Sequence, residues 1–186
     1  MEALVRNWWM IVVRGGLAAA FGLSILLPRN VTLSHIVLLF GVYALMDGLW
    51  ATAAGLRASR PRFAAWPVVL EGAVSVVLGL IALGRPFVSR EFVYVLVGWG
   101  LFTGVLEIIG AARLPREAAG HWFLTTGGAS SLFLALLVFS LPHASLDVVA
   151  TIVGAYAIVF GIAVLLAAVR FHCQRPAVGR VARTAA

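Results

Sequence analysis

Four ionisable side chains lie within otherwise apolar stretches of the sequence: Arg14, Asp47, Glu71 and Glu107. A charge in apolar surroundings is costly, so each of them is a candidate functional residue by default. One guanidinium and three carboxylates could pair between helices, and carboxyl groups held away from water could bind or relay protons. The structural alternative is that they only hold helices together, or lie close enough to water to be solvated.

No enzyme pattern accompanies these residues. The sequence contains no phosphate-binding glycine loop, no nucleophile elbow and no zinc-binding pattern. His172 and Cys173 are neighbours, but two potential ligands are too few for a metal site. We therefore predict no catalytic, cofactor-binding or metal-binding residues and no enzymatic activity.

The composition indicates a protein that lives in lipid. Of the 186 residues, 62% are hydrophobic and only 11% are charged, whereas about 25% are charged in a typical soluble domain. All basic residues are arginines, and the formal net charge is +7. They lie mostly at the ends of apolar runs, where arginines meet lipid headgroups. We expect membrane lipid as a partner and no nucleic acid.

Six apolar runs are long enough to form transmembrane helices, which need about 20 mainly apolar residues each. They cover residues 8–27, 33–56, 66–84, 92–112, 122–141 and 147–169. The predicted fold is therefore an all-α integral membrane protein with six transmembrane helices.

The arginines orient these helices. Only Arg29, Arg85 and Arg90 lie between runs on one side of the membrane. The other side receives Arg6, Arg57, Arg60, Arg62, Arg113, Arg116, Arg170, Arg175, Arg180 and Arg183. Positive residues are enriched on the cytoplasmic side, so we predict that both termini lie in the cytoplasm. At a rise of ~1.5 Å per residue, the four ionisable residues then share a layer roughly 8–14 Å from the cytoplasmic edge.

An internal repeat divides the chain. A tryptophan opens each odd-numbered run, and a proline follows it twenty residues later. These residues are Trp8 and Pro28, Trp66 and Pro86, and Trp122 and Pro142. The repeat predicts three helical hairpins at about 8–57, 66–113 and 122–170 in one transmembrane domain, 1–170. An Arg-rich cytoplasmic tail without regular structure is expected at 171–186.

Pairs of small residues recur in the even-numbered runs. They are Ala44 and Gly48, Gly100 and Gly104, and Ala157 and Gly161. Small residues four apart let helix backbones approach closely in lipid, so we predict helix packing at these positions. Two arrangements remain open. The even-numbered helices could meet one another about a pseudo-threefold axis, or each could pack within its own hairpin.

The repeat also relates the charged residues. Arg14 and Glu71 hold similar positions after the tryptophans of their hairpins, so a salt bridge between the first and third helices is expected. Asp47 or Glu107 could share it. The third hairpin has two glycines, 127–128, at this position, and the layer is shallow. Both points favour the structural interpretation of the four residues.

Three hairpins with this arrangement of Trp, Gly and Pro resemble the HdeD-type acid-resistance membrane proteins, which are small six-span proteins of the bacterial inner membrane. The resemblance runs from Trp8 to about Arg170 and rests on the hairpin architecture. It implies a role in surviving acid or related stress at the cytoplasmic membrane. It brings no catalytic residues to this sequence.

Two functions follow from these observations. The first is a non-enzymatic HdeD-like membrane protein that acts by packing with lipid, with a second copy of itself or with a membrane-protein partner. The alternative is a small channel or transporter for protons or a small solute that uses Asp47, Glu71 and Glu107. Carboxylates facing a wet, continuous cavity would favour transport, whereas carboxylates capped by Arg14 and backbone would favour a structural role.

Overall fold

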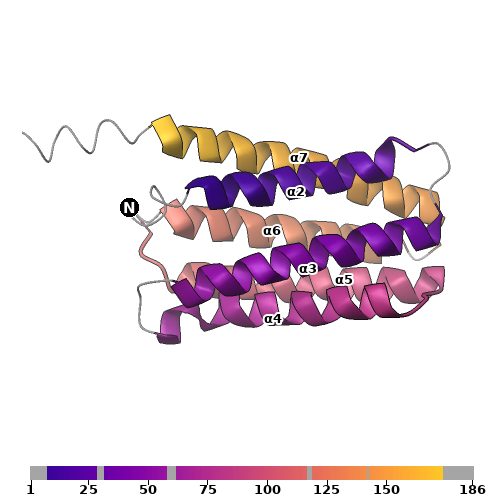
Figure 1. Cartoon of the computed structure of the whole chain (residues 1–186), viewed down its shortest axis with the longest axis horizontal. Coiled ribbons are helices and arrows are strands. Elements are labelled where there is room, and N and C mark those ends of the chain that lie inside the picture. Colours follow the sequence, from indigo (N-terminus) through magenta and orange to yellow (C-terminus); the bar gives the residue numbers. More distant parts are fainter. Residues whose placement is uncertain (1–7, 29–31, 58–61, 117–118, 142, 174–186) are drawn as a thin grey trace, which may run out of the picture.

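The computed structural model describes the backbone of residues 8–28, 32–57, 62–116, 119–141 and 143–173, and the side chains of 12–28, 32–56, 66–116, 121–141 and 143–169. Within these residues the chain forms six α-helices and no strand. They are α2 (Trp8–Leu26), α3 (Leu33–Arg57), α4 (Arg62–Gly84), α5 (Ser89–Ala112), α6 (Ala119–Phe139) and α7 (Leu146–Cys173). All six run along the long axis of the molecule (Figure 1). The predicted all-helical architecture is confirmed for the described residues.

Several helices are longer than the apolar runs that predicted them. α4 begins at Arg62 and α6 at Ala119, a few residues before the tryptophans that open the apolar runs. α7 continues to Cys173, which takes it into the first residues of the predicted tail. Helix formation does not require apolar residues, so a helix can extend past the apolar run into polar turns. Pro142 and residues 174–186 lie outside the described residues.

Both ends of the described chain lie at the same end of the bundle (Figure 1). α2 begins there with Trp8 and α7 finishes there with Cys173. We call this the N-terminal end. α2, α4 and α6 finish at the opposite end.

The described helices are consistent with a multi-pass membrane protein. Five segments are long and apolar enough to cross a bilayer: Leu33–Leu56, Trp66–Gly84, Ser89–Ala112, His121–Phe139 and Leu146–Val169. In α2 the apolar segment with described side chains, Val12–Leu26, is shorter. The exterior is apolar as well: Leu49, Val77, Phe133 and Val159 are all more than half exposed.

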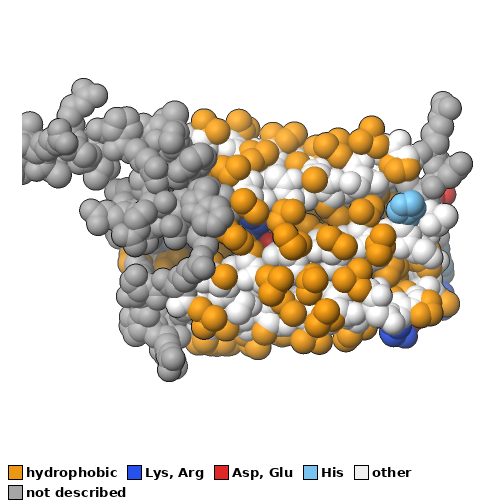
Figure 2. Space-filling view, viewed as in Figure 1, with side chains coloured by type: hydrophobic (Ala, Val, Ile, Leu, Met, Phe, Trp, Pro, Cys, Tyr) orange, Lys and Arg blue, Asp and Glu red, His pale blue; other side chains and the backbone are white. Residues whose placement is uncertain are grey.

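Charged side chains are scarce on the middle of the face seen in Figure 2. Hydrophobic side chains are spread over the described surface there, and basic and histidine side chains appear at the opposite end. Between α2 and α3, one acidic and one basic side chain are visible below the surrounding hydrophobic surface (Figure 2). Most of this face therefore suits contact with lipid.

The closest helix packing occurs between the predicted hairpins. α3 packs most closely on α4, α5 on α6, and α7 returns to pack on α2. Helices of the same hairpin, such as α2 and α3, touch each other much less. Both predicted arrangements of the small residues are therefore wrong, because each even-numbered run packs on a helix of the next hairpin. Together these contacts close the six helices into a ring.

Glycines make these contacts possible. Gly48 of α3 faces Gly72 of α4, and a Cβ atom on Gly48 would lie 2.6 Å from the carbonyl oxygen of Gly72. The other two pairs repeat this contact, between Gly104 and Gly128 and between Gly161 and Gly15. Gly15, Gly72 and Gly128 recur at an almost constant interval along the sequence, and we call residues related by this interval equivalent positions. Small residues are the usual way for helix backbones to meet in lipid.

We expect Gly48→Ala to destabilise the protein by about 1–3 kcal/mol, the usual cost of overpacking. Its Cβ would meet backbone atoms of Gly72 at 2.6 Å and of Val76 at 2.7 Å. Gly98→Ala in α5 is the matched control, because a Cβ there would have no atom of another helix within 4 Å and alanine favours helix. Thermal unfolding in detergent, followed by circular dichroism, compares the two. Equal melting temperatures would contradict the role of the close contact.

Candidate functional site

Four helices contribute one charged residue each to a buried ionic cluster: Arg14 of α2, Asp47 of α3, Glu71 of α4 and Glu107 of α5. Arg14 Nη2 donates a hydrogen bond to Glu107 Oε1 at 2.7 Å and lies 3.5 Å from Glu71 Oε1. Arg14 Nε lies 3.0 Å from Asp47 Oδ1. The structure thus brings together all four residues singled out in the sequence, and we call them the Arg14 cluster.

The three acidic residues are buried far more deeply than surface ion pairs are. Asp47 is 4% exposed, and Glu71 and Glu107 are 1% exposed. When all three carboxyl groups are ionised, the cluster carries three negative charges and one positive charge. Additional protons or a cation would neutralise the excess. Charge balance therefore makes the cluster a place where protons can be held inside the bundle.

Two carboxylate oxygens of the cluster have unused hydrogen-bonding capacity. Glu71 Oε1 and Glu107 Oε2 are buried and accept no hydrogen bond from the described part of the protein. Arg14 Nε pairs with Asp47 by charge, but it also lacks the alignment of a hydrogen bond. Buried polar atoms usually have a partner, so these acceptors are suited to a proton or a water molecule.

A glycine makes room for the cluster. Gly127 of α6 occupies the position equivalent to Arg14 and Glu71. A Cβ atom on Gly127 would lie 2.8 Å from Glu107 Oε2. The missing acid of the third hairpin therefore has a steric reason, since any side chain there would displace the Glu107 carboxylate.

A cavity of about 60 Å³ runs from the cluster into the middle of the bundle. Such a volume holds about two to four water molecules. Arg14, Asp47 and Glu71 line it, whereas Glu107 is not among its lining residues. All six helices contribute to the wall. Two of the carboxylates thus face a cavity, while Glu107 is capped by Arg14.

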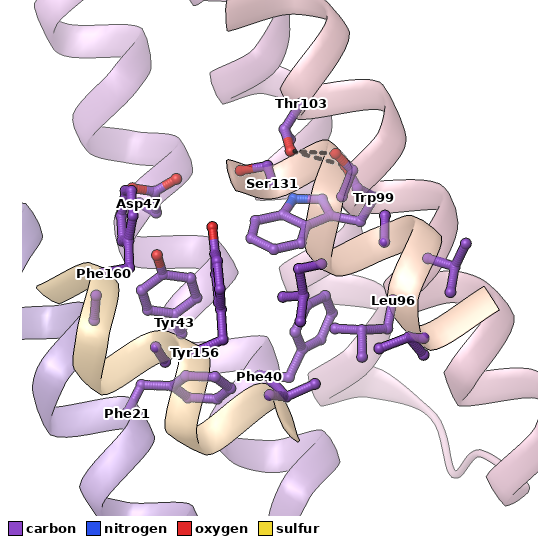
Figure 3. A pocket seen from close by; sticks show the side chains of 18 of the residues that line it. Phe21, Phe40, Tyr43, Asp47, Leu96, Trp99, Thr103, Ser131, Tyr156 and Phe160 are labelled. Atoms are coloured by element: carbon purple, nitrogen blue, oxygen red, sulfur yellow. Dashed lines mark hydrogen bonds between the residues drawn. The ribbon is translucent and has the colours of Figure 1, made fainter. Parts of the chain in front are cut away.

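Three large aromatic residues at equivalent positions form the middle of the cavity wall: Tyr43, Trp99 and Tyr156. Their polar atoms point towards the end of the cavity that holds Asp47, and Phe21 and Phe40 lie at the other end (Figure 3). The cavity therefore changes from polar to apolar along its length.

Hydrogen bonds fix two of these aromatic rings. Trp99 Nε1 donates to Ser75 Oγ at 2.9 Å, and the Tyr156 hydroxyl donates to Ser130 Oγ at 3.0 Å. The third ring, Tyr43, stacks on Phe21 with ring centroids 4.9 Å apart. The sequence analysis did not identify Tyr43, Trp99 and Tyr156 as a cavity wall. Their recurrence at the interval of the repeat was the signal that could have found it.

Other polar residues considered in the sequence lie away from the cluster. Arg85 and Glu91 form an exposed ion pair at the opposite end. Among the residues with described side chains, no group of three or more His, Cys, Asp or Glu side chains could hold a metal ion. The Arg14 cluster and its cavity are therefore the candidate functional site.

We expect Arg14→Met to destabilise the protein by about 3–5 kcal/mol at neutral pH, because it strands three buried carboxylates. The loss should shrink at acidic pH, where protons replace the missing guanidinium. Arg85→Met is the matched control: its pair with Glu91 is 49% and 40% exposed, and exposed pairs contribute about 1 kcal/mol or less. Unfolding in detergent at pH 5 and pH 8 measures both variants. A pH-independent loss for Arg14→Met would contradict the proton-holding role.

The family described as a short repeat of unknown function (DUF308) matches the chain three times, at residues 13–83, 70–140 and 126–179. The starts of the three matches are separated by the same interval as Gly15, Gly72 and Gly128, so the family repeat and the glycine contacts are in register. The first match runs from α2 into α4 and the second from α4 into α6, so they include the closely packed pairs α3–α4 and α5–α6.

The HdeD-type proteins, which the sequence resembles, belong to the same repeat family. The comparisons with curated proteins and with solved structures found no match. Since the three family matches together cover well over half of its residues, the chain belongs to the DUF308 family.

Proposed function

We propose that the chain is a non-enzymatic, HdeD-like protein of the bacterial inner membrane that contributes to acid or general stress resistance. In this proposal all six helices span the membrane as three repeated hairpins, with both termini in the cytoplasm. It acts by packing with lipid, with a second copy or with a membrane-protein partner.

The lengths and charges support this membrane arrangement. α2 has 19 residues, which at ~1.5 Å each give about 28 Å, close to the ~30 Å hydrocarbon core. Of the described residues, Arg85 and Arg90 lie near the opposite end of the bundle. In this proposal that end faces away from the cytoplasm, and few arginines are expected on that side. The described connections between helices are short, so any chemistry would take place inside the bundle.

The observation that carries the proposal is the convergence of three buried carboxylates on Arg14. Each carboxyl group that takes up a proton loses part of its attraction to the guanidinium and gains a hydrogen-bond donor. The cluster joins four of the six helices. Acid therefore changes the forces that hold these helices together, and this is a physical basis for a response to acid at the membrane.

Survival of acid exposure tests this function. A bacterial strain that lacks the gene should survive acid several-fold less well than the same strain carrying it, with equal growth at neutral pH. Arg14→Met should fail to restore survival, whereas the control Arg85→Met should restore it, at equal amounts of protein in the membrane. Equal survival with and without the gene, under acid and under other envelope stresses, would contradict the proposal.

A second candidate function is transport of protons or a small solute. The observation that favours it is that Asp47 and Glu71 line the central cavity and that Glu71 Oε1 has no hydrogen-bond partner among the described residues. A carboxylate that faces a cavity can exchange its proton with water there, which a fully enclosed ion pair cannot do.

Proton flux into proteoliposomes tests the transport function. Under an imposed pH gradient, the unmodified protein should give a flux above that of empty vesicles. The triple variant Asp47→Asn, Glu71→Gln and Glu107→Gln should abolish it, because amides cannot exchange protons in this range. Arg85→Met serves as the control that keeps the flux. Absence of any flux from the folded, unmodified protein would exclude this function.

A further inference from the structure

One of the three helix pairs departs from the repeat at the opposite end of the bundle. In the α2–α7 pair, a Cβ on Gly22 would lie 2.5 Å from the carbonyl oxygen of Gly154. In the α3–α4 pair, a Cβ on Gly79 would lie 2.9 Å from the carbonyl oxygen of Gly41. The equivalent residues of the α5–α6 pair are not glycines.

Ala135 and Val97 occupy these positions in the α5–α6 pair. Ala135 is the equivalent of Gly79, and Val97 is the equivalent of Gly41. Helices meet most closely where both residues are glycine. Val97 carries a side chain where Gly41 carries only a hydrogen atom, so the α5–α6 pair lacks the glycine-to-glycine contact that the other two pairs make at the opposite end.

A groove of about 560 Å³ lies at this end of the α5–α6 pair. Its wall comes from the beginnings of α5 and α7 and from the end of α6 with the residues that follow. Arg90, Tyr94 and His143 supply polar groups, and Phe139 and Leu146 supply apolar ones. Arg90, Tyr94 and His143 are all exposed, so the groove opens at the surface of the bundle.

The groove and the central cavity share two wall residues, Val97 and Val138. Both are buried, at 5% and 2% exposure. They therefore stand between the groove and the cavity. From Val97 to Thr103, which lines the cavity at the level of its equivalent Asp47, α5 rises about 9 Å.

We propose that water and protons reach the Arg14 cluster from the opposite end of the bundle, through this groove and the cavity, with Val97 and Val138 as the narrow apolar barrier between them. This access route deepens the second candidate function and rests on it for its biological purpose.

The barrier blocks water by being apolar as well as narrow. A hydrophobic constriction loses its water and can open by becoming wet. Val97→Thr keeps the shape of the side chain but adds a hydroxyl group, so it makes the barrier wettable without widening it much. Val37→Thr is the matched control, because Val37 of α3 is similarly buried, at 6% exposure, and is not among the lining residues of the groove or cavity.

Radiolytic hydroxyl-radical labelling of the intact protein measures the water near cavity side chains. In Val97→Thr the labelling rates of Trp99 and Tyr156 should rise several-fold, and in Val37→Thr they should stay at the level of the unmodified protein. A second pair of variants changes volume instead: Val138→Ala should raise both rates, whereas Ile25→Ala at the equivalent position of α2 should not, since Ile25 is not among the residues lining either space.

Two results would overturn the route. Equal increases in a variant and its control would mean that the bundle loosens without a specific barrier. High labelling in the unmodified protein that Val97→Thr and Val138→Ala leave unchanged would mean that water arrives from elsewhere, such as the recess between α2 and α3. Because labelling reports water and not transport, it separates this inference from the flux assay: a wetted cavity without flux keeps the route and removes the transport function.

Discussion

The close backbone contact between paired helices is the constraint on which the rest of the structure depends. Helices in lipid gain no hydrophobic free energy by meeting, so they associate where small residues let their backbones touch. Gly48 and Gly72 do this in the α3–α4 pair, and equivalent glycines do it in the other two pairs. Because each pair joins neighbouring hairpins, the last helix must return to the first, and the chain closes into a ring.

No described helix runs through the centre of the ring, so side chains alone fill it. These side chains come from equivalent positions of the three repeats. Three equivalent aromatic residues surround the middle of the cavity. In the layer of the Arg14 cluster, by contrast, the three repeats carry different residues. Arg14, Glu71 and Gly127 hold equivalent positions, and they supply a cation, an anion and an empty space. Glu107 uses that space, so the cluster exists because the three repeats stopped being alike at one level of the bundle.

The six helices and the level of the charged residues could be predicted, because apolar runs and the helical rise are local properties of the sequence. The partner of each helix could not. The pair Ala44 and Gly48 predicts a close helix contact but does not identify the partner helix. The missing information lay in Gly72, whose equivalents Gly15 and Gly128 recur at the interval of the repeat. The cavity depends on how large side chains share the centre of a ring, which no local pattern encodes.

In this bundle, positions that keep the same residue type in all three repeats hold the helices together. Positions that differ between the repeats supply the charged and polar groups of the candidate site. A fully regular threefold ring would have three identical closed pairs and no reason to hold a charge at its centre. Val97 stands where the other two pairs have a glycine and lines the groove, and Gly127 stands where the other repeats have Arg14 and Glu71 and leaves room for Glu107. The two changes lie at different levels of α5 and α6, and the cavity lies between these levels. Val97 and Gly127 both depart from the repeat, and both lie along the proposed route from the groove to the Arg14 cluster. A common function explains this placement more readily than two independent losses of symmetry.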